Sequence, residues 1–170
     1  PRSQAGTHHK NTLRKGDVCK MIICEKARQG KLLMNQLITE GNLELAALVG
    51  LMYQTPICIA DLTRMKKSIL KGNAVWTVAK KTGKPYVDIC GDAYRVTKEL
   101  RNLLLSINCD TDMIFTKSAA IYRKELKKYG LPFPLHEFRH EFIFYEYIRH
   151  RSKRRHKSRL TMIDVYLHEK

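Results

Sequence analysis

Polar residues in the C-terminal third of the chain have the types and spacing that phosphate chemistry requires. His136 and Arg139 are three residues apart, so on a helix both side chains project from the same face. An arginine offers a forked pair of donors that matches two phosphate oxygens, and an imidazole adds a further hydrogen bond. Farther along, His156 opens a His-Lys-Ser run, and Tyr166 stands ten residues after His156. From spacing alone, surface residues on a basic helix remain the simpler interpretation.

The charge of the chain indicates a polyanionic partner. Its 170 residues include 32 Lys and Arg against 16 Asp and Glu, a formal net charge of +16. Nucleic acid, an anionic membrane surface and a ribosome all suit this excess. The segment RHRSKRRHKSR, residues 149–159, contains seven Lys or Arg and no acid, a density that would release counterions from a phosphate backbone. A flexible basic tail is the alternative. The predicted DNA-binding residues are Arg149, Arg151, Lys153, Arg154, Arg155, Lys157 and Arg159.

Composition and cysteine spacing exclude several classes of protein. A hydrophobic content of 44% is typical of a folded domain, and no run approaches the roughly 18 to 20 apolar residues of a membrane span. We therefore expect a soluble, intracellular protein with no membrane partner. The histidines at 136, 140, 150 and 156 have no thiol or carboxylate partners at ligand spacing, so we expect no metal site. The cysteines, which we expect to be reduced, are Cys19, Cys24, Cys58, Cys90 and Cys109.

The elements that must position these residues are mostly helical. Apolar periodicity and end signals predict helices over residues 13–29, 43–54, 59–65, 92–107, 118–129, from 136 onward, and 160–167. Asn42 caps the second of these, and Gly30 closes the first. Two β-rich runs around a Lys-Thr-Gly-Lys-Pro turn predict a hairpin over 74–79 and 86–89. The fold class is mainly α with a small antiparallel β-sheet (α+β), as one domain over 13–170 after a disordered lead-in over 1–12.

Four segments, in their order along the chain, resemble the catalytic domain of the tyrosine recombinases, the phage-integrase family. LAALVGLMYQTPICIADLTRMKKSIL is similar to the two helices that hold the first arginine box of the family. AKKTGKP resembles its lysine-bearing hairpin, and LHEFRH resembles its His-x-x-Arg box. RHKS followed by Tyr166 resembles the segment that leads to the nucleophile. The resemblance spans Leu13 to Lys170, and the joint order is more specific than any one segment.

The resemblance implies a fold, a reaction and roles for particular residues. Tyr166 would attack a DNA phosphodiester and form a 3′-phosphotyrosyl bond, which the 5′-hydroxyl of a second strand later reverses. Arg139 would neutralise charge on the transition state, and His136 and His156 would hydrogen-bond phosphate oxygens or shuttle protons. Lys81, which stands directly before Thr-Gly, would be the general acid for the leaving oxygen. No metal or other cofactor is needed, because the covalent intermediate keeps the bond energy.

Two departures from the family pattern bear on activity. The acid of the first arginine box is best matched by Asp61, which places Cys58 where the family has an arginine. A thiol cannot supply forked positive charge, so Cys58 predicts an impaired enzyme or a pseudo-recombinase. Between Arg139 and His156 the chain is about five residues shorter than is usual in the family, which affects the placement of His156 and Tyr166 most.

The family also suggests partners. We expect duplex DNA as the ligand, self-association into a tetramer on DNA, and an origin in a phage, virus or other mobile element. Family members usually carry an N-terminal DNA-binding domain, which these 170 residues do not contain. A catalytically impaired DNA-binding protein on the same fold is the first alternative, and a basic RNA-binding or ribosomal protein is the second. The interpretation that we favour is a site-specific DNA recombinase or integrase catalytic domain.

Overall fold

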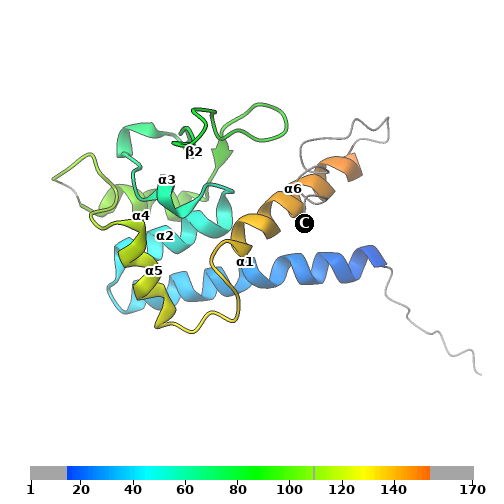
Figure 1. Ribbon diagram of the computed structural model, residues 1–170, viewed down its shortest axis with the longest axis horizontal. Coiled ribbons are helices and arrows are strands. Elements are labelled where there is room, and N and C mark those ends of the chain that lie inside the picture. Colours follow the sequence, from blue (N-terminus) through cyan, green and yellow to red (C-terminus); the bar gives the residue numbers. More distant parts are fainter. Residues whose placement is uncertain (1–14, 109, 154–170) are drawn as a thin grey trace, which may run out of the picture.

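Helices form most of the molecule, and a small sheet lies along one side (Figure 1). The computed structural model describes residues 15–108 and 110–153, with side chains for residues 25–108 and 110–147. The helices are α1 (Lys15–Thr39), α2 (Leu43–Gln54), α3 (Ile59–Leu62), the 3-10 helix η1 (Lys67–Ile69), α4 (Lys98–Ser106), α5 (Ala119–Lys127) and α6 (Glu137–Lys153). The strands are β1 (Leu70–Lys71), β2 (Ala74–Val75) and β3 (Tyr94–Arg95), paired antiparallel in that order. The mainly α class with a small antiparallel sheet is confirmed; the expected lead-in and final helix lie outside the described residues.

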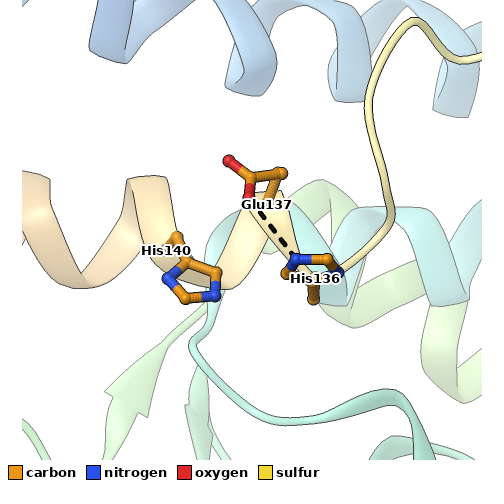
Figure 2. A group of neighbouring side chains, drawn as sticks. All are labelled: His136, Glu137 and His140. Atoms are coloured by element: carbon orange, nitrogen blue, oxygen red, sulfur yellow. Dashed lines mark ion pairs between the residues drawn. The ribbon is translucent and has the colours of Figure 1, made fainter. Parts of the chain in front are cut away.

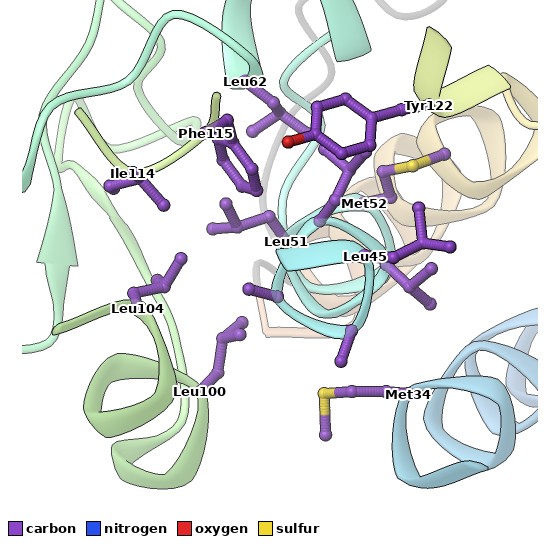
Figure 3. Close-up of a cluster of buried hydrophobic side chains, with 14 of the residues drawn as sticks. Met34, Leu45, Leu51, Met52, Leu62, Leu100, Leu104, Ile114, Phe115 and Tyr122 are labelled. Atoms are coloured by element: carbon purple, nitrogen blue, oxygen red, sulfur yellow. The ribbon is translucent and has the colours of Figure 1, made fainter. Parts of the chain in front are cut away.

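The centre of the fold is α2, which is apolar around its whole circumference. Every residue from Leu45 to Met52 is buried, because α1, α4 and α6 all pack against this helix. Figure 3 shows how side chains from other elements converge on α2, among them Met34, Leu100 and Tyr122. The predicted helix over 43–54 is confirmed; Asn42 occupies its N-cap position, but the Asn42 side chain does not make the expected capping hydrogen bond. Because neighbours hold α2 on all sides, the position of its C-terminal end is fixed. The segment with Cys58 starts from that end.

The first helix is longer than the sequence pattern predicted. We expected it to end at Gly30, whereas α1 continues to Thr39. Gly30 is needed there for close packing rather than for termination. A Cβ atom at Gly30 would lie 2.9 Å from Phe138 and 2.9 Å from Tyr53, so only glycine lets α1 approach the start of α6 and the end of α2 this closely. The turn that ends α1 comes at Gly41, whose φ is +77°.

The predicted hairpin is present, but with short pairings. Residues Val78 and Pro85 form an antiparallel bridge, and the Ala79 amide donates to the Lys84 carbonyl at 2.8 Å. The turn passes through Gly83 at a φ of +66°, a left-handed conformation that favours glycine. The regular strand β2 covers only Ala74–Val75, and it pairs with β1 and β3, which the sequence analysis did not anticipate.

Helix α4 begins six residues later than predicted. Tyr94 and Arg95, expected inside a helix over 92–107, are extended and form β3 against β2. Thr97 is the true N-cap, because its hydroxyl accepts a hydrogen bond from the Leu100 amide at 3.3 Å. Pairing with a strand that is close in space therefore outweighed helical periodicity over the first turns.

The last two described helices follow the predictions closely. Helix α5 lies within the predicted range 118–129 and ends before Gly130, whose φ is +61°. Helix α6 begins at Glu137, one residue after the predicted start. Phe138 is 2% exposed and packs edge-on against Phe133, which anchors the first turn of α6 to the core. That anchor fixes the backbone at the neighbouring His136 and Arg139.

Candidate functional site

A pocket of about 520 Å³ brings two of the predicted site segments together. Cys58, from the segment between α2 and α3, lines it from one side. Arg139 and His136, from the start of α6, line it from another. By the resemblance, Cys58 stands where the recombinase family has its first arginine, and Arg139 belongs to the His-x-x-Arg box. These positions are 81 residues apart in the chain and share one cavity in the fold.

The lining of this pocket is cationic. Besides Arg139, it includes Arg123 and Lys127, which are four residues apart on α5 and so lie on one face of that helix. No acidic side chain of the described residues lines the pocket. The remaining wall is apolar and excludes water from one side, which strengthens the attraction of such a site for an anion.

Arg139, one of the residues that line the pocket, has a hydrogen-bond donor without a partner in the described part of the chain. Its Nε atom is buried and has no hydrogen-bond partner among the described residues. A buried guanidinium donor without a partner costs on the order of 1–3 kcal/mol, more if the charge itself is desolvated. A phosphate or other anion would offset this cost only if the side chain turned so that Nε faced the pocket, since the atom is now covered.

The start of α6 places both imidazoles on the same face as Arg139. The His140 amide donates to the His136 carbonyl at 3.2 Å, so the helical spacing already holds at His136. Figure 2 shows the two rings side by side, and their centroids are 5.3 Å apart. His136 is 61% exposed at its side chain and therefore has freedom to turn toward a ligand. Glu137 points toward α1, where Lys26 Nζ lies 2.7 Å from its carboxylate.

Behind the pocket, Asp61 ties the first box to the predicted lysine hairpin. Its carboxylate accepts hydrogen bonds from the Cys58 thiol at 3.0 Å, the Tyr86 hydroxyl at 2.8 Å and the Lys80 amide at 3.2 Å. Burial alone would raise the pKa of Asp61, but these bonds and nearby Arg64 lower the pKa below its ordinary value. Asp61 is therefore a buried anion that orients Cys58 and holds the base of the hairpin.

Two other residues near the first box lie outside the pocket. Arg64 is 3.8 Å from the Asp61 carboxylate and does not line the pocket, so it does not substitute for an arginine at position 58. Lys81, the expected general acid, is exposed in the hairpin turn and is not among the lining residues. The base of the hairpin is joined to the first box by the hydrogen bond from the Lys80 amide to the Asp61 carboxylate. Lys81 itself does not line the cavity.

The remaining predicted residues cannot be placed in the site. Tyr166 and His156 lie outside the described residues, as do Arg154, Arg155, Lys157 and Arg159. Arg149, Arg151 and Lys153 belong to the last turns of α6, of which only the backbone is described.

Sequence reasoning missed two residues that line the pocket and one neighbour of its histidines. Arg123 and Lys127 belong to a helix that was predicted to be basic, and their i, i+4 spacing is the signal that would have singled them out. The expectation that the histidines have no carboxylate partner is corrected by Glu137, because one ligand atom each of His136, Glu137 and His140 lie within 4.8 Å of one another. The His-Glu-x-x-His pattern in the sequence contained that signal.

Comparisons of the chain with protein-family profiles, with curated proteins and with solved structures found no match. Among the described residues, no helix combines the length and apolar character that a membrane crossing requires. The assignment of a function therefore depends on the geometry of the pocket and on the sequence segments that form it.

Proposed function

We propose that this chain is a tyrosine-recombinase-like catalytic domain that binds duplex DNA and breaks and rejoins it through a 3′-phosphotyrosyl intermediate. The observation that carries the proposal is the cationic pocket shared by Cys58 and Arg139. In the family, the first arginine box and the His-x-x-Arg box bind the same phosphate. The resemblance therefore predicts that these two segments lie close together, which the composition and periodicity of the chain do not predict. The shared pocket is what the resemblance predicts, and it therefore supports the proposal.

A second observation supports the same proposal. The family pattern has an acid three residues after the first-box position, and here that acid is Asp61, 7% exposed and hydrogen-bonded to Cys58. The same carboxylate accepts from the Lys80 amide, beside the expected general acid Lys81. Three of the four resembling segments therefore meet around one pocket and the carboxylate behind it.

In the proposed reaction, Arg139 clamps the scissile phosphate and His136 donates a further hydrogen bond to it. Tyr166 attacks phosphorus and passes its hydroxyl proton to the His156 imidazole, while the bond to the 5′ oxygen breaks and Lys81 supplies the proton that the leaving oxygen takes up. His156 assists at the phosphate. For Lys81 to act, the hairpin turn must approach the bound DNA, because Lys81 lies outside the pocket lining.

Cys58 favours a second candidate, a recombinase-fold protein that binds DNA without cutting it. A thiol that already donates to Asp61 at 3.0 Å brings no positive charge to the phosphate. Losing one preorganised donor lowers the rate by about 10²- to 10³-fold, and losing a charged donor lowers it further. Both candidates need the same phosphate-binding pocket, and they differ only in the covalent step.

A nicked suicide DNA substrate distinguishes the two candidates. After cleavage the short 5′ fragment diffuses away, so a phosphotyrosyl adduct accumulates and survives a denaturing gel. The proposal predicts an adduct with the wild-type chain, none with Tyr166→Phe, and a faster one with Cys58→Arg. An adduct that persists in Tyr166→Phe would remove Tyr166 as the nucleophile. Adduct absent from both the wild type and Cys58→Arg would exclude catalysis and leave the non-catalytic candidate.

A further inference from the structure

His136 and His140, which line the pocket, form with Glu137 a group of three side chains that suits a transition metal. His136 and His140 are separated by one helical turn, and Glu137 lies between them in the sequence (Figure 2). One ligand atom from each residue lies within 4.8 Å of the others. Two imidazoles at i and i+4 are a common pair of ligands for Zn²⁺, and a carboxylate is a common third.

The distances are close to those that zinc requires. Zinc bonds of roughly 2.0–2.1 Å in a tetrahedron place neighbouring ligand atoms about 3.3 Å apart. His136 Nε2 and Glu137 Oε1 are already 3.4 Å apart. The remaining separations, up to 4.8 Å, need a closure of about 1.5 Å at most, which side-chain rotation supplies because His136 is 61% exposed.

The carboxylate is also held in place by its neighbour. Lys26 Nζ binds Glu137 Oε2 at 2.7 Å, which leaves Oε1 as the oxygen that faces His136. Partners that hold a ligand in this way fix its direction before the metal binds. Lys26 in α1 is thus a positioning residue for the carboxylate and is not itself a ligand.

From this arrangement we infer that His136, Glu137 and His140 form a binding site for Zn²⁺. Three protein ligands leave a fourth position for water or for an anion in the pocket. Arg139 lies on the same face of α6 and repels a divalent cation, so we expect micromolar rather than nanomolar affinity. The inference goes beyond the proposed function and does not depend on DNA cleavage.

Calorimetric titration of the chelator-treated full chain with ZnCl₂ alone tests the site. The buffer contains a non-thiol reductant and no phosphate. Because His8 and His9 form another candidate pair, the matched variants are His136→Asn with His140→Asn, and His8→Asn with His9→Asn. We expect the first double variant to bind Zn²⁺ at least tenfold more weakly than the wild type, and the second to bind within twofold of it.

Two further variants separate the ligand role of Glu137 from its ion pair. Both Glu137→Gln and Lys26→Met break that pair, but only Glu137→Gln removes a ligand oxygen. We expect at least tenfold weaker Zn²⁺ binding in Glu137→Gln and a smaller loss, of about two- to fivefold, in Lys26→Met, because Lys26 directs the carboxylate without binding the metal. Zinc should also raise the melting temperature of the wild type and not that of the His136/His140 variant. Equal affinity in the wild type and that variant, or a loss confined to the His8/His9 variant, would overturn the inference.

Discussion

Replacing Cys58 by arginine should convert a neutral wall of the pocket into a second phosphate clamp. Cys58 and Arg139 line one cavity of about 520 Å³, which has room for the larger side chain. Asp61, three residues later, now accepts from the thiol and would instead orient the guanidinium. We therefore expect Cys58→Arg to fold and to bind duplex DNA more tightly than the wild type.

The size of this effect follows from one new charged contact. A hydrogen bond to a charged group contributes about 1.5–3 kcal/mol, which corresponds to roughly 10- to 150-fold in affinity. Each additional phosphate contact also steepens the salt dependence of log K by about 0.9. A fourfold rise in salt, from about 50 to about 200 mM, should then reduce the affinity of the variant about 3.5-fold more than that of the wild type.

Fluorescence anisotropy with a labelled duplex at several salt concentrations measures both quantities. Cys90→Arg is the matched control, because it makes the same substitution and the same change of net charge at an exposed cysteine outside the pocket. We expect Cys90→Arg to strengthen binding by less than about threefold, through long-range attraction alone. Equal gains in the two variants would refute the assignment of position 58 to a phosphate-binding pocket.

Further predictions concern the groups that support the site. Asp61→Asn should lower the free energy of unfolding in urea by roughly 2–4 kcal/mol, because it leaves the half-buried Tyr86 hydroxyl and the Lys80 amide competing for a single acceptor oxygen. Since folding lowers the pKa of Asp61, its contribution is complete above its unfolded pKa near 3.9 and is lost as the pH falls through the lower folded value. The difference in melting temperature between wild type and Asp61→Asn should therefore narrow below about pH 4; a constant difference would contradict this. Gly30→Val should lower the melting temperature by several degrees, because even a Cβ there would lie 2.9 Å from Phe138. An unchanged melting temperature would contradict this packing role.

The sequence predicted the elements whose signals are local. Helix α2 follows from its continuous apolar run and Asn42, and α5 follows from its periodicity and the Gly130 stop. Where neighbours far apart in sequence decide the outcome, the predictions were wrong. Glycine is common at helix ends, but Gly30 lies inside α1, where the closeness of Phe138 and Tyr53 leaves no room for a larger side chain. Residues 92–97 have helical periodicity and are extended because β2 pairs with Tyr94.

For the site, the order of the segments along the chain predicted which of them lie close together. The other residues that line the pocket became known only from the fold. The pairing of Cys58 with Arg139 was expected only through the resemblance, because nothing local links them. Arg123 and Lys127 were not expected, since a basic helix shows which residues are charged without showing what they face. The positions of Tyr166 and His156 stay predictions.

The central claim is that the pocket around Arg139 binds a phosphate of duplex DNA. The most direct test is the salt dependence of duplex binding by Arg139→Ala compared with Arg28→Ala, which removes the same charge from an exposed site on α1 outside the pocket. The account predicts at least tenfold weaker binding and a salt slope smaller by about 0.9 for Arg139→Ala, with little change for Arg28→Ala. Identical affinities and slopes for the two variants, with both correctly folded, would contradict it.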